Sequence, residues 1–338
     1  MPQRVLICGG GGFVGTVLAR RLLSMGHEVR VLDTFWFGDF LGPHDRLIKI
    51  RGDMRDGELV DRAVDGVESV IQLACLSNDP TSDLDAGLTR AINYDACADV
   101  IHRAKAAGVR RFIYASSASV YGVRDEPDIT EQMDLAPITL YSQYKAEIEQ
   151  VLFDAGSDRF TTVAVRNSTV CGVSPRMRLD LIISIFVMVA MKKGVITIEG
   201  GTQLRPLIHI EDLLDLYELL LDADRQKIDR QAFNISSNNY PVLDVARMVQ
   251  ARIPCRLEFA SFTDPRSYHV STDKARRVLG YRATRPIEAS IDEIKDAFDR
   301  SLIDETDRRS YNIRHIKHLL ETVPDQVFFT GGRTMPVA

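Results

Sequence analysis

The chain has 338 residues, of which 45% are hydrophobic and 26% are charged, and its formal net charge at pH 7 is −5. These values are typical of a globular protein with one large domain or two modest ones. The acidic balance disfavours nonspecific binding of nucleic acid, although a local basic pocket for an anionic ligand remains compatible with it.

The cysteine pattern favours a reducing compartment. The five cysteines are odd in number and lack metal-like spacing, so reduced thiols in a cytoplasmic protein without a metal site are expected. A strand pattern already begins at residue 4, which argues against a signal peptide. The longest apolar run, residues 181–191, is too short to span a bilayer, so we expect no membrane association.

Short apolar strands alternate with helices through the first half of the chain. Strand patterns occur at residues 4–8, 28–33, 47–50, 69–73, 112–115 and 162–165. Helical patterns lie between most of them, at residues 14–25, 56–63, 84–107 and 141–152. This alternation predicts an α/β protein with a parallel sheet covered on both faces, and right-handed crossovers make it a doubly wound, Rossmann-type sheet.

The pattern changes after residue 166. Prolines punctuate shorter elements, and helical patterns recur at residues 179–193, 211–221, 287–298 and 309–321. We therefore expect a smaller mixed α/β lobe beside the main sheet. The predicted division is a dinucleotide-binding domain at 1–168, to which 206–236 returns, a second lobe at 169–205 and 237–300, and a tail at 301–338.

A glycine-rich turn follows the first predicted strand. Gly9, Gly12 and Gly15 give the spacing G-x-x-G-x-x-G between a strand and a helix, which is the context that this motif requires. Glycine permits a tight turn there and lets backbone N–H groups approach a pyrophosphate at the positive end of the helix dipole. The turn therefore predicts a dinucleotide site.

Asp33 closes the second predicted strand, where a carboxylate can accept hydrogen bonds from both ribose hydroxyls of an adenosine. A 2′-phosphate would be repelled by this carboxylate, and no arginine follows it at once. These observations favour NAD over NADP.

Tyr141 and Lys145 are spaced i, i+4, which places them one turn apart on the same face of a predicted helix. An ammonium held beside a phenol favours the phenolate, so Tyr141 is expected to act as a base below its usual pKa. Ser117 stands where an oxidoreductase that uses nicotinamide would need a hydroxyl beside that tyrosine.

Five motifs occur in one order along the chain: the glycine motif, Gly52–Asp56, Ser116–Gly122, Tyr141-x-x-x-Lys145 and Arg205–His209. With them the chain resembles the extended short-chain dehydrogenase/reductases, specifically the NAD-dependent epimerase/dehydratase family that acts on nucleotide sugars. The resemblance covers residues 4–300. It implies a Rossmann domain, NAD as cofactor and a nucleotide-diphosphate sugar as substrate.

The resemblance also implies roles for individual residues. Ser117, Tyr141 and Lys145 match the catalytic residues of the family. The expected cofactor contacts are Gly9, Gly12, Phe13, Val14, Gly15, Asp33, Asp53, Met54, Leu73, Ala74, Asn93, Tyr141 and Lys145, with Asn93 as a buttress of the active-site strand. The expected substrate contacts are Ser117, Thr169, Arg176, Arg205 and Arg266, of which Arg205 and Arg266 match arginines that bind the nucleotide diphosphate.

The neighbours of Ser117 separate the possible reactions. Dehydratases of the family use an Asp-Glu pair where this chain has Ala118 and Ser119, and enzymes that epimerise C3 and C5 use a cysteine at the place of Ser119. Both reactions are therefore disfavoured. A sugar epimerase acting at C4 and a net C4 dehydrogenase or ketoreductase remain, because both use the same three residues. We favour the epimerase. A noncatalytic NAD-binding protein of the same fold is the alternative in which the chain is not an enzyme.

Two further expectations follow from the resemblance. Residues 174–181 and 264–268 resemble bacterial enzymes acting on GDP-heptoses and related sugars at C4, whereas Thr169 and Cys171 replace an asparagine and a tyrosine common in sugar epimerases. The helices near 84–107 and 141–152 resemble the pair through which the family forms a homodimer.

Overall fold

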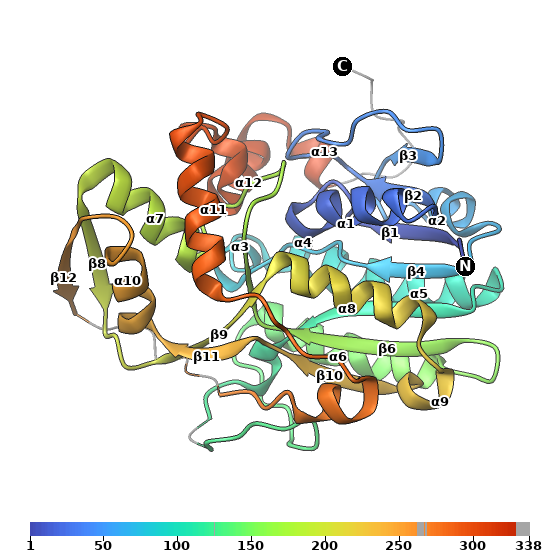
Figure 1. Cartoon of the computed structure of the whole chain (residues 1–338). Helices are drawn as coiled ribbons and strands as arrows, with labels where there is room; N and C mark the ends of the chain where they lie inside the picture. Colours follow the sequence, from blue (N-terminus) through green and yellow to red (C-terminus); the bar gives the residue numbers. More distant parts are fainter. Residues whose placement is uncertain (125, 262–266, 268, 329–338) are drawn as a thin grey trace.

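The computed structural model describes residues 1–124, 126–261, 267 and 269–328. Its centre is a seven-stranded sheet in the order β10-β6-β5-β4-β1-β2-β3, and all of its strand pairs are parallel. The strands are β1 (Arg4–Cys8), β2 (Glu28–Asp33), β3 (Leu47–Arg51), β4 (Ser69–Gln72), β5 (Arg111–Ser117), β6 (Thr161–Asn167) and β10 (Gln231–Ile235). The predicted doubly wound fold is confirmed (Figure 1).

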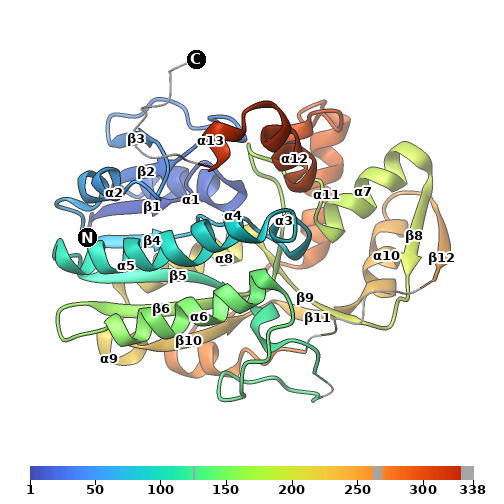
Figure 2. The same ribbon diagram turned by 180° about the vertical axis from the view of Figure 1, so that it is seen from behind.

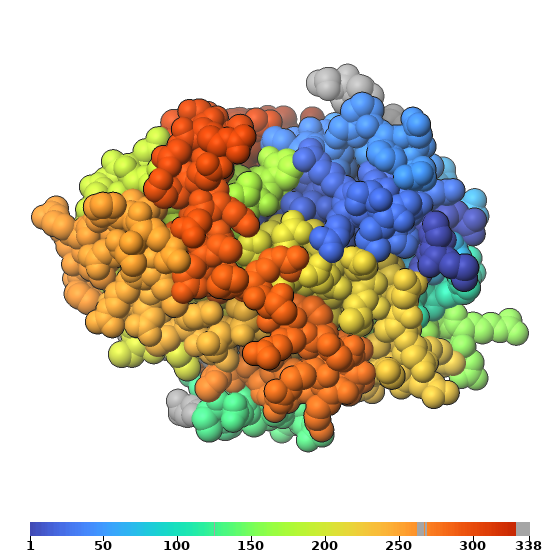
Figure 3. Space-filling model, viewed as in Figure 1, coloured from blue at the N-terminus to red at the C-terminus, as the bar shows by residue number. Residues whose placement is uncertain are grey.

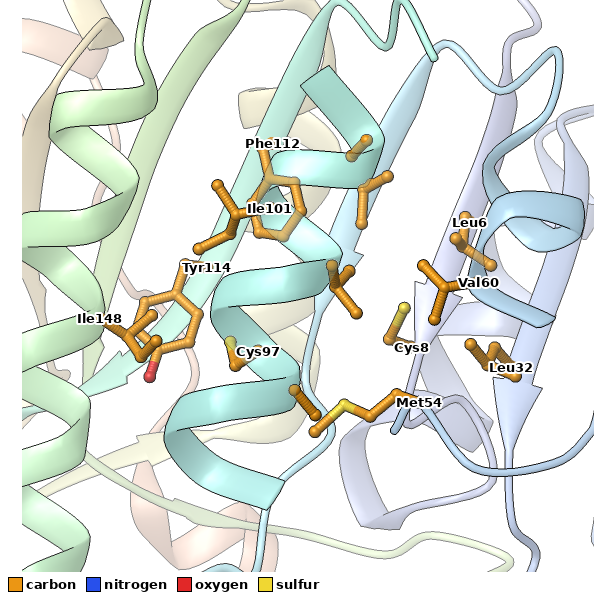
Figure 4. Packing of buried hydrophobic residues seen from close by; sticks show 14 of the residues in the cluster. Leu6, Cys8, Leu32, Met54, Val60, Cys97, Ile101, Phe112, Tyr114 and Ile148 are labelled. Carbon is orange, nitrogen blue, oxygen red and sulfur yellow. The ribbon is translucent and has the colours of Figure 1, made fainter. Parts of the chain in front are cut away.

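Helices cover both faces of this sheet. One face carries α1 (Phe13–Ser24) and α8 (Ile210–Asp222), which lie in front in Figure 1. The other carries α2 (Gly57–Val64), α5 (Cys97–Ala106) and α6 (Leu140–Ala155), which lie in front in Figure 2. Successive strand residues point to opposite faces, so Leu6 and Cys8 pack under α2 and α5 (Figure 4), whereas Val5 and Ile7 pack under α1 and α8.

The predicted helix at residues 84–107 is divided in the structure. It consists of α4 (Ala86–Arg90), a π-helical turn η1 (Ala91–Ala96) and α5, and a short helix α3 (Asp79–Ser82) precedes it. Asn93 lies in the π-helical turn, where its side chain accepts a hydrogen bond from the Leu76 N–H at 2.8 Å and donates one to the Leu76 carbonyl at 3.1 Å. π-Turns inside helices are frequent at functional sites.

A smaller set of elements lies beyond β6. A three-stranded sheet contains β7 (Thr169–Cys171), β9 (Leu204–His209) and β11 (Asn238–Pro241), and β8 (Val195–Glu199) pairs with β12 (Arg256–Ala260). The helices α7 (Ile182–Lys193), α10 (Val242–Gln250) and α11 (Ile287–Asp299) pack around one hydrophobic cluster. Figure 3 shows α11 lying across the junction between this lobe and the N-terminal half. The mixed lobe confirms the predicted fold class, whereas the predicted domain boundaries stay a prediction.

The remaining elements connect or complete these two parts. They are η2 (Ala118–Tyr121), α9 (Arg225–Ile228), η3 (Ala275–Leu279), η4 (Arg308–Ser310), α12 (Asn312–Thr322) and α13 (Pro324–Phe328). The last two belong to the C-terminal tail and lie beside α3 and the β2–β3 edge of the sheet (Figure 2). Across the described ranges, no helix combines the length and the hydrophobicity needed to cross a bilayer.

Candidate active site

A cleft of about 550 Å³ opens at the carboxyl ends of β1 and β4, where the strand order reverses. This is the position at which doubly wound sheets bind their ligands. Its lining includes the predicted site residues Gly9, Gly12, Phe13, Val14, Gly15, Asp33, Asp53, Met54, Leu73, Ala74, Ser117, Tyr141, Lys145, Thr169, Arg176 and Arg205. Asn93 lies behind the cleft wall, where it holds Leu76, and Arg266 lies outside the described residues.

The glycine-rich turn forms one end of the cleft. Gly9 has a φ of +83°, and a Cβ there would lie 2.5 Å from the Ala74 nitrogen. A Cβ on Gly15 would lie 2.3 Å from the Gly9 carbonyl oxygen, so both positions exclude any side chain. Helix α1 starts directly after Gly12 without an acidic residue in its first turn, which leaves its positive end available to an anion.

Asp33 is held beside this turn. Its carboxylate accepts hydrogen bonds from the Gly11 N–H at 2.9 Å and from the Phe35 N–H at 2.7 Å. These bonds fix the carboxylate at the end of β2, next to the phosphate-binding turn, where the sequence analysis expects it to meet the adenosine ribose.

The residues expected to contact the adenine, Asp53 and Met54, have other partners in the structure. Asp53 lines the cleft, but its carboxylate forms a bidentate ion pair with Arg55, with Nε at 2.9 Å and Nη2 at 2.6 Å. Arg55 in turn donates to the Val327 carbonyl in α13 at 2.6 Å. Met54 is nearly buried and receives a long contact of 3.5 Å from the Gln72 amide. This wall is therefore tied to the C-terminal segment.

Ser117, Tyr141 and Lys145 meet at the carboxyl ends of β5 and β6. Thr139 caps α6 by accepting from the Ser142 N–H at 3.2 Å, so the helix starts at Leu140, one residue before the tyrosine. The Lys145 ammonium donates to the Ala115 carbonyl at 2.6 Å and lies 5.6 Å from the centre of the Tyr141 ring. The Ser117 hydroxyl is hydrogen-bonded to Tyr141 and accepts from the Ser119 hydroxyl at 2.9 Å.

The electrostatics of Tyr141 differ from the expectation. Its pKa is raised above the ordinary value, first by burial and then by the neighbouring Cys75 and Asp79, while the Ser117 hydrogen bond and the charge of Arg178 act in the opposite direction. The predicted lowering of the pKa by Lys145 is therefore wrong for the protein without ligands. Desolvation of the phenolate outweighs the ammonium, which points at the Ala115 carbonyl.

Sequence reasoning missed several residues of this site. Cys75, Asp79 and Arg178 line the cleft near Tyr141. Asp79 accepts a hydrogen bond from the Thr139 hydroxyl at 2.6 Å, which anchors it two residues from the tyrosine. Tyr141 is thus accompanied by a carboxylate, that of Asp79, which the sequence analysis did not anticipate. The described residues contain no group of three potential metal ligands.

A buried ion pair supports these residues from behind. Arg166 donates to Glu149 through Nε at 3.0 Å and Nη2 at 2.6 Å, and Ser116 donates to the same carboxylate. Burial lowers the pKa of Arg166, but the hydrogen bond and the charge of Glu149 outweigh burial, so the net pKa is raised. Glu149 lies one turn after Lys145, a spacing that could have revealed it from the sequence.

Comparison with known proteins identifies the family of this cleft. Residues 5–236 match the model of the NAD dependent epimerase/dehydratase family. The chain belongs to this family. It is similar to the UDP-glucose 4-epimerase of Lactobacillus helveticus, with 26% identity over 86% of this chain and 94% of the relative, and to that of Streptococcus mutans, with 29% identity over 82% and 91%.

Solved structures agree with this assignment. The chain is similar to MoeE5 in complex with UDP-glucuronic acid and NAD, with a TM-score of 0.78 and 26% identity over 88% of this chain and 99% of MoeE5. The epimerase Mth375 of Methanothermobacter thermautotrophicus shares the fold, with a TM-score of 0.82 and 23% identity over 92% of this chain and 95% of Mth375. The protein is an NAD-dependent enzyme. The cleft fits this cofactor, because Gly9 and Gly15 leave no side chain where a pyrophosphate approaches and Asp33 lies beside them.

Proposed function

We propose that this protein is a nucleotide-sugar epimerase that oxidises the C4 hydroxyl of its sugar to a ketone and reduces it again from the other face. The observation that carries the proposal is the meeting of Ser117, Tyr141 and Lys145 in the cleft that also holds the glycine-rich turn. The similarity to UDP-glucose 4-epimerases along more than four-fifths of the chain supports the same reaction.

The chain's own residues supply positioning and proton transfer. Tyr141 takes the proton of the sugar hydroxyl through its phenolic oxygen and later returns it. The Ser117 hydroxyl is hydrogen-bonded to Tyr141 and holds the same sugar oxygen near the base. Lys145, fixed by the Ala115 carbonyl, contributes a positive charge close to the phenolate. NAD, when bound, supplies the redox chemistry by accepting hydride from the sugar carbon and giving it back.

The substrate would enter from the smaller lobe. Thr169, Arg205 and Pro206 line this side of the cleft, and β7 and β9 place them side by side. An arginine guanidinium binds phosphate oxygens in two places, so we propose that Arg205 binds the nucleotide diphosphate. Arg266, which lies outside the described residues, stays a prediction for the same role.

A panel of UDP-, GDP-, TDP- and CDP-sugars tests the reaction, with products identified by NMR and NADH followed by absorbance. Product isomers without lasting NADH support the epimerase. Stable NADH accumulation with one sugar would instead establish the net C4 dehydrogenase that uses the same residues, and the epimerase would then be wrong.

Tyr141→Phe tests the assignment of the base. We expect turnover to fall about 10²- to 10⁴-fold, which is the usual contribution of a positioned acid–base group. Tyr144→Phe is the matched control, because Tyr144 lies on the same helix but packs against Tyr94 with a ring distance of 5.9 Å. Equal rates for the two variants would remove Tyr141 from the mechanism.

Two coarser predictions are left for direct measurement. We propose a homodimer formed through α5 and α6, which light scattering at micromolar concentration would test, and a monomer mass would contradict it. We also propose a cytoplasmic location, which fractionation of the source cells would test.

A further inference from the structure

Arg176 has an unusual environment for a residue expected to bind substrate. Its side chain is 3% exposed, and its guanidinium carbon lies 3.9 Å from the centre of the Phe37 ring. Phe37 belongs to the segment that follows β2, four residues after Asp33. Arg176 and Phe37 line the same cleft as the glycine-rich turn. The stacking therefore places Arg176 on the side of the cleft that is formed by Asp33 and the segment after β2.

The charge of Arg176 is not neutralised by a close carboxylate. Among the described residues, none forms an ion pair with it, and its Nε is buried without a hydrogen-bond partner. Nη2 donates to the Asn312 Oδ1 at 2.5 Å. Burial and then the charge of Arg178 lower the pKa of Arg176 to about 9, although the charges of Asp180 and Asp33 act in the opposite direction. A buried cation of this kind is unfavourable until an anion reaches it.

The loop that carries Arg176 crosses the start of α1. The Ser174 hydroxyl donates to the Phe13 carbonyl at 2.7 Å, and Phe13 is the first residue of α1. Asp33, whose charge acts on Arg176, is itself bonded to Gly11 of the same turn. Arg176 is thus held close to the place where backbone N–H groups receive a pyrophosphate.

We infer that Arg176 binds the pyrophosphate of the bound dinucleotide and that Asn312, on the C-terminal helix α12, is the positioning residue that holds it there. A phosphate oxygen supplies the negative charge that the buried guanidinium lacks. The inference changes the role that the sequence suggested for Arg176 from substrate contact to cofactor contact. It rests on NAD binding and does not depend on which sugar reaction the enzyme catalyses.

Asn312 is well placed for this role. Its backbone N–H donates to the Asp180 carboxylate at 3.0 Å, and its side-chain amide donates to the Ser77 hydroxyl at 2.7 Å. One turn later, Ile316 also lines the cleft, and between them His315 is bonded to the Trp36 carbonyl at 2.6 Å. Helix α12, which lies beyond the 5–236 match and beside α3 (Figure 2), therefore contributes Asn312 and Ile316 to the wall of the cleft.

The fluorescence of Trp36 provides a direct readout, because it is the single tryptophan of the chain and lines the cleft. Quenching of the purified full-length protein by NAD, after removal of copurified cofactor, gives the Kd without any sugar present. We expect Arg176→Gln to raise this Kd about 10- to 100-fold, the effect of losing a hydrogen bond to a charged group. Adenosine, which has no phosphate, should bind both proteins equally.

Asn312→Ala should raise the Kd for NAD about 3- to 10-fold, less than the loss of Arg176, because the guanidinium remains and loses only the hydrogen bond that positions it. Because Asn312 acts through Arg176, the double variant should bind NAD no more weakly than Arg176→Gln alone. Lys317→Gln, which removes an exposed positive charge from the same helix, is the control and should leave the Kd unchanged.

Three results would overturn the inference. If Arg176→Gln weakened binding of UDP and left NAD binding intact, Arg176 would serve the substrate, as the sequence suggested. If adenosine and NAD binding weakened by the same factor, the variant would have damaged the cleft and not a phosphate contact. If the effects of the two substitutions multiplied in the double variant, Asn312 would not act through Arg176. The sugar reaction could fail its own test without changing any of these outcomes.

Discussion

The ion pair behind the active site gives the sharpest prediction about stability. Glu149 and Arg166 have side chains that are 3% and 6% exposed, and the carboxylate receives two arginine nitrogens and the Ser116 hydroxyl. Glu149→Ala leaves the arginine buried without its counter-ion, which typically costs about 3–5 kcal/mol. Since a whole domain is stable by only about 5–15 kcal/mol, this is a large fraction of the free energy of unfolding.

Urea unfolding followed by far-UV circular dichroism measures this loss as a lower midpoint with an unchanged m-value. Glu147→Ala is the matched control on the same helix, because among the described contacts Glu147 accepts a hydrogen bond only from the surface residue Gln143. This substitution should lower the free energy of unfolding by less than about 0.5 kcal/mol. The pair Glu149→Leu with Arg166→Met should recover most of the stability, because neither charge is then buried alone. If Glu149→Ala cost no more than Glu147→Ala, the reasoning from burial would be refuted.

Further predictions concern the cofactor and the base. Gly15→Ala should abolish the quenching of tryptophan fluorescence by NAD, because the added Cβ would lie 2.3 Å from a backbone oxygen of the turn. Gly87→Ala, where the nearest atom is 3.4 Å away, is the control and should retain the quenching. Equal affinities of the two variants for NAD would contradict the assignment of the turn to the cofactor. Ser117→Ala removes a hydrogen bond that lowers the pKa of Tyr141, so the rise of kcat/KM with pH should move to higher pH. Asp79→Asn removes a charge that raises the pKa of Tyr141, so the rise of kcat/KM with pH should move to lower pH. If the pH profiles of the two variants moved in the opposite directions, Tyr141 would be excluded as the titrating base.

The fold was largely predictable because it depends on local patterns. Alternating strands and helices predicted the parallel sheet, in which β10 pairs with β6 as the seventh strand. The helical pattern at residues 84–107 did not predict the π-helical turn, because that turn occurs where Asn93 forms hydrogen bonds with the Leu76 backbone. Those bonds depend on a tertiary contact across 17 positions, and a helical periodicity contains no information about such a contact.

The cleft was predictable to the extent that its residues belong to contiguous motifs. The glycine-rich turn, Asp33 and the tyrosine–lysine pair lie in such motifs, and all of them line it. Asp79 begins the short helix α3, which has no periodic signal in the sequence, and its carboxylate accepts a hydrogen bond from Thr139 beside the site. Asn312 lies in a tail for which the sequence suggested no role, since nothing in a polar helix indicates which cleft it covers.

The proton affinity of Tyr141 shows why residue spacing does not determine chemistry. The i, i+4 lysine is present, yet its ammonium is directed to the Ala115 carbonyl, and burial raises the pKa of the tyrosine. The influences that then adjust this pKa come from Cys75 and Asp79 after β4, Ser117 at the end of β5 and Arg178 in the loop after β7. Because the last of these loops also carries Arg176, the segment 174–180 contributes side chains both to the cofactor cleft and to the surroundings of the base. The proton affinity of Tyr141 therefore depends on where the fold places these groups, which the spacing of Tyr141 and Lys145 does not show.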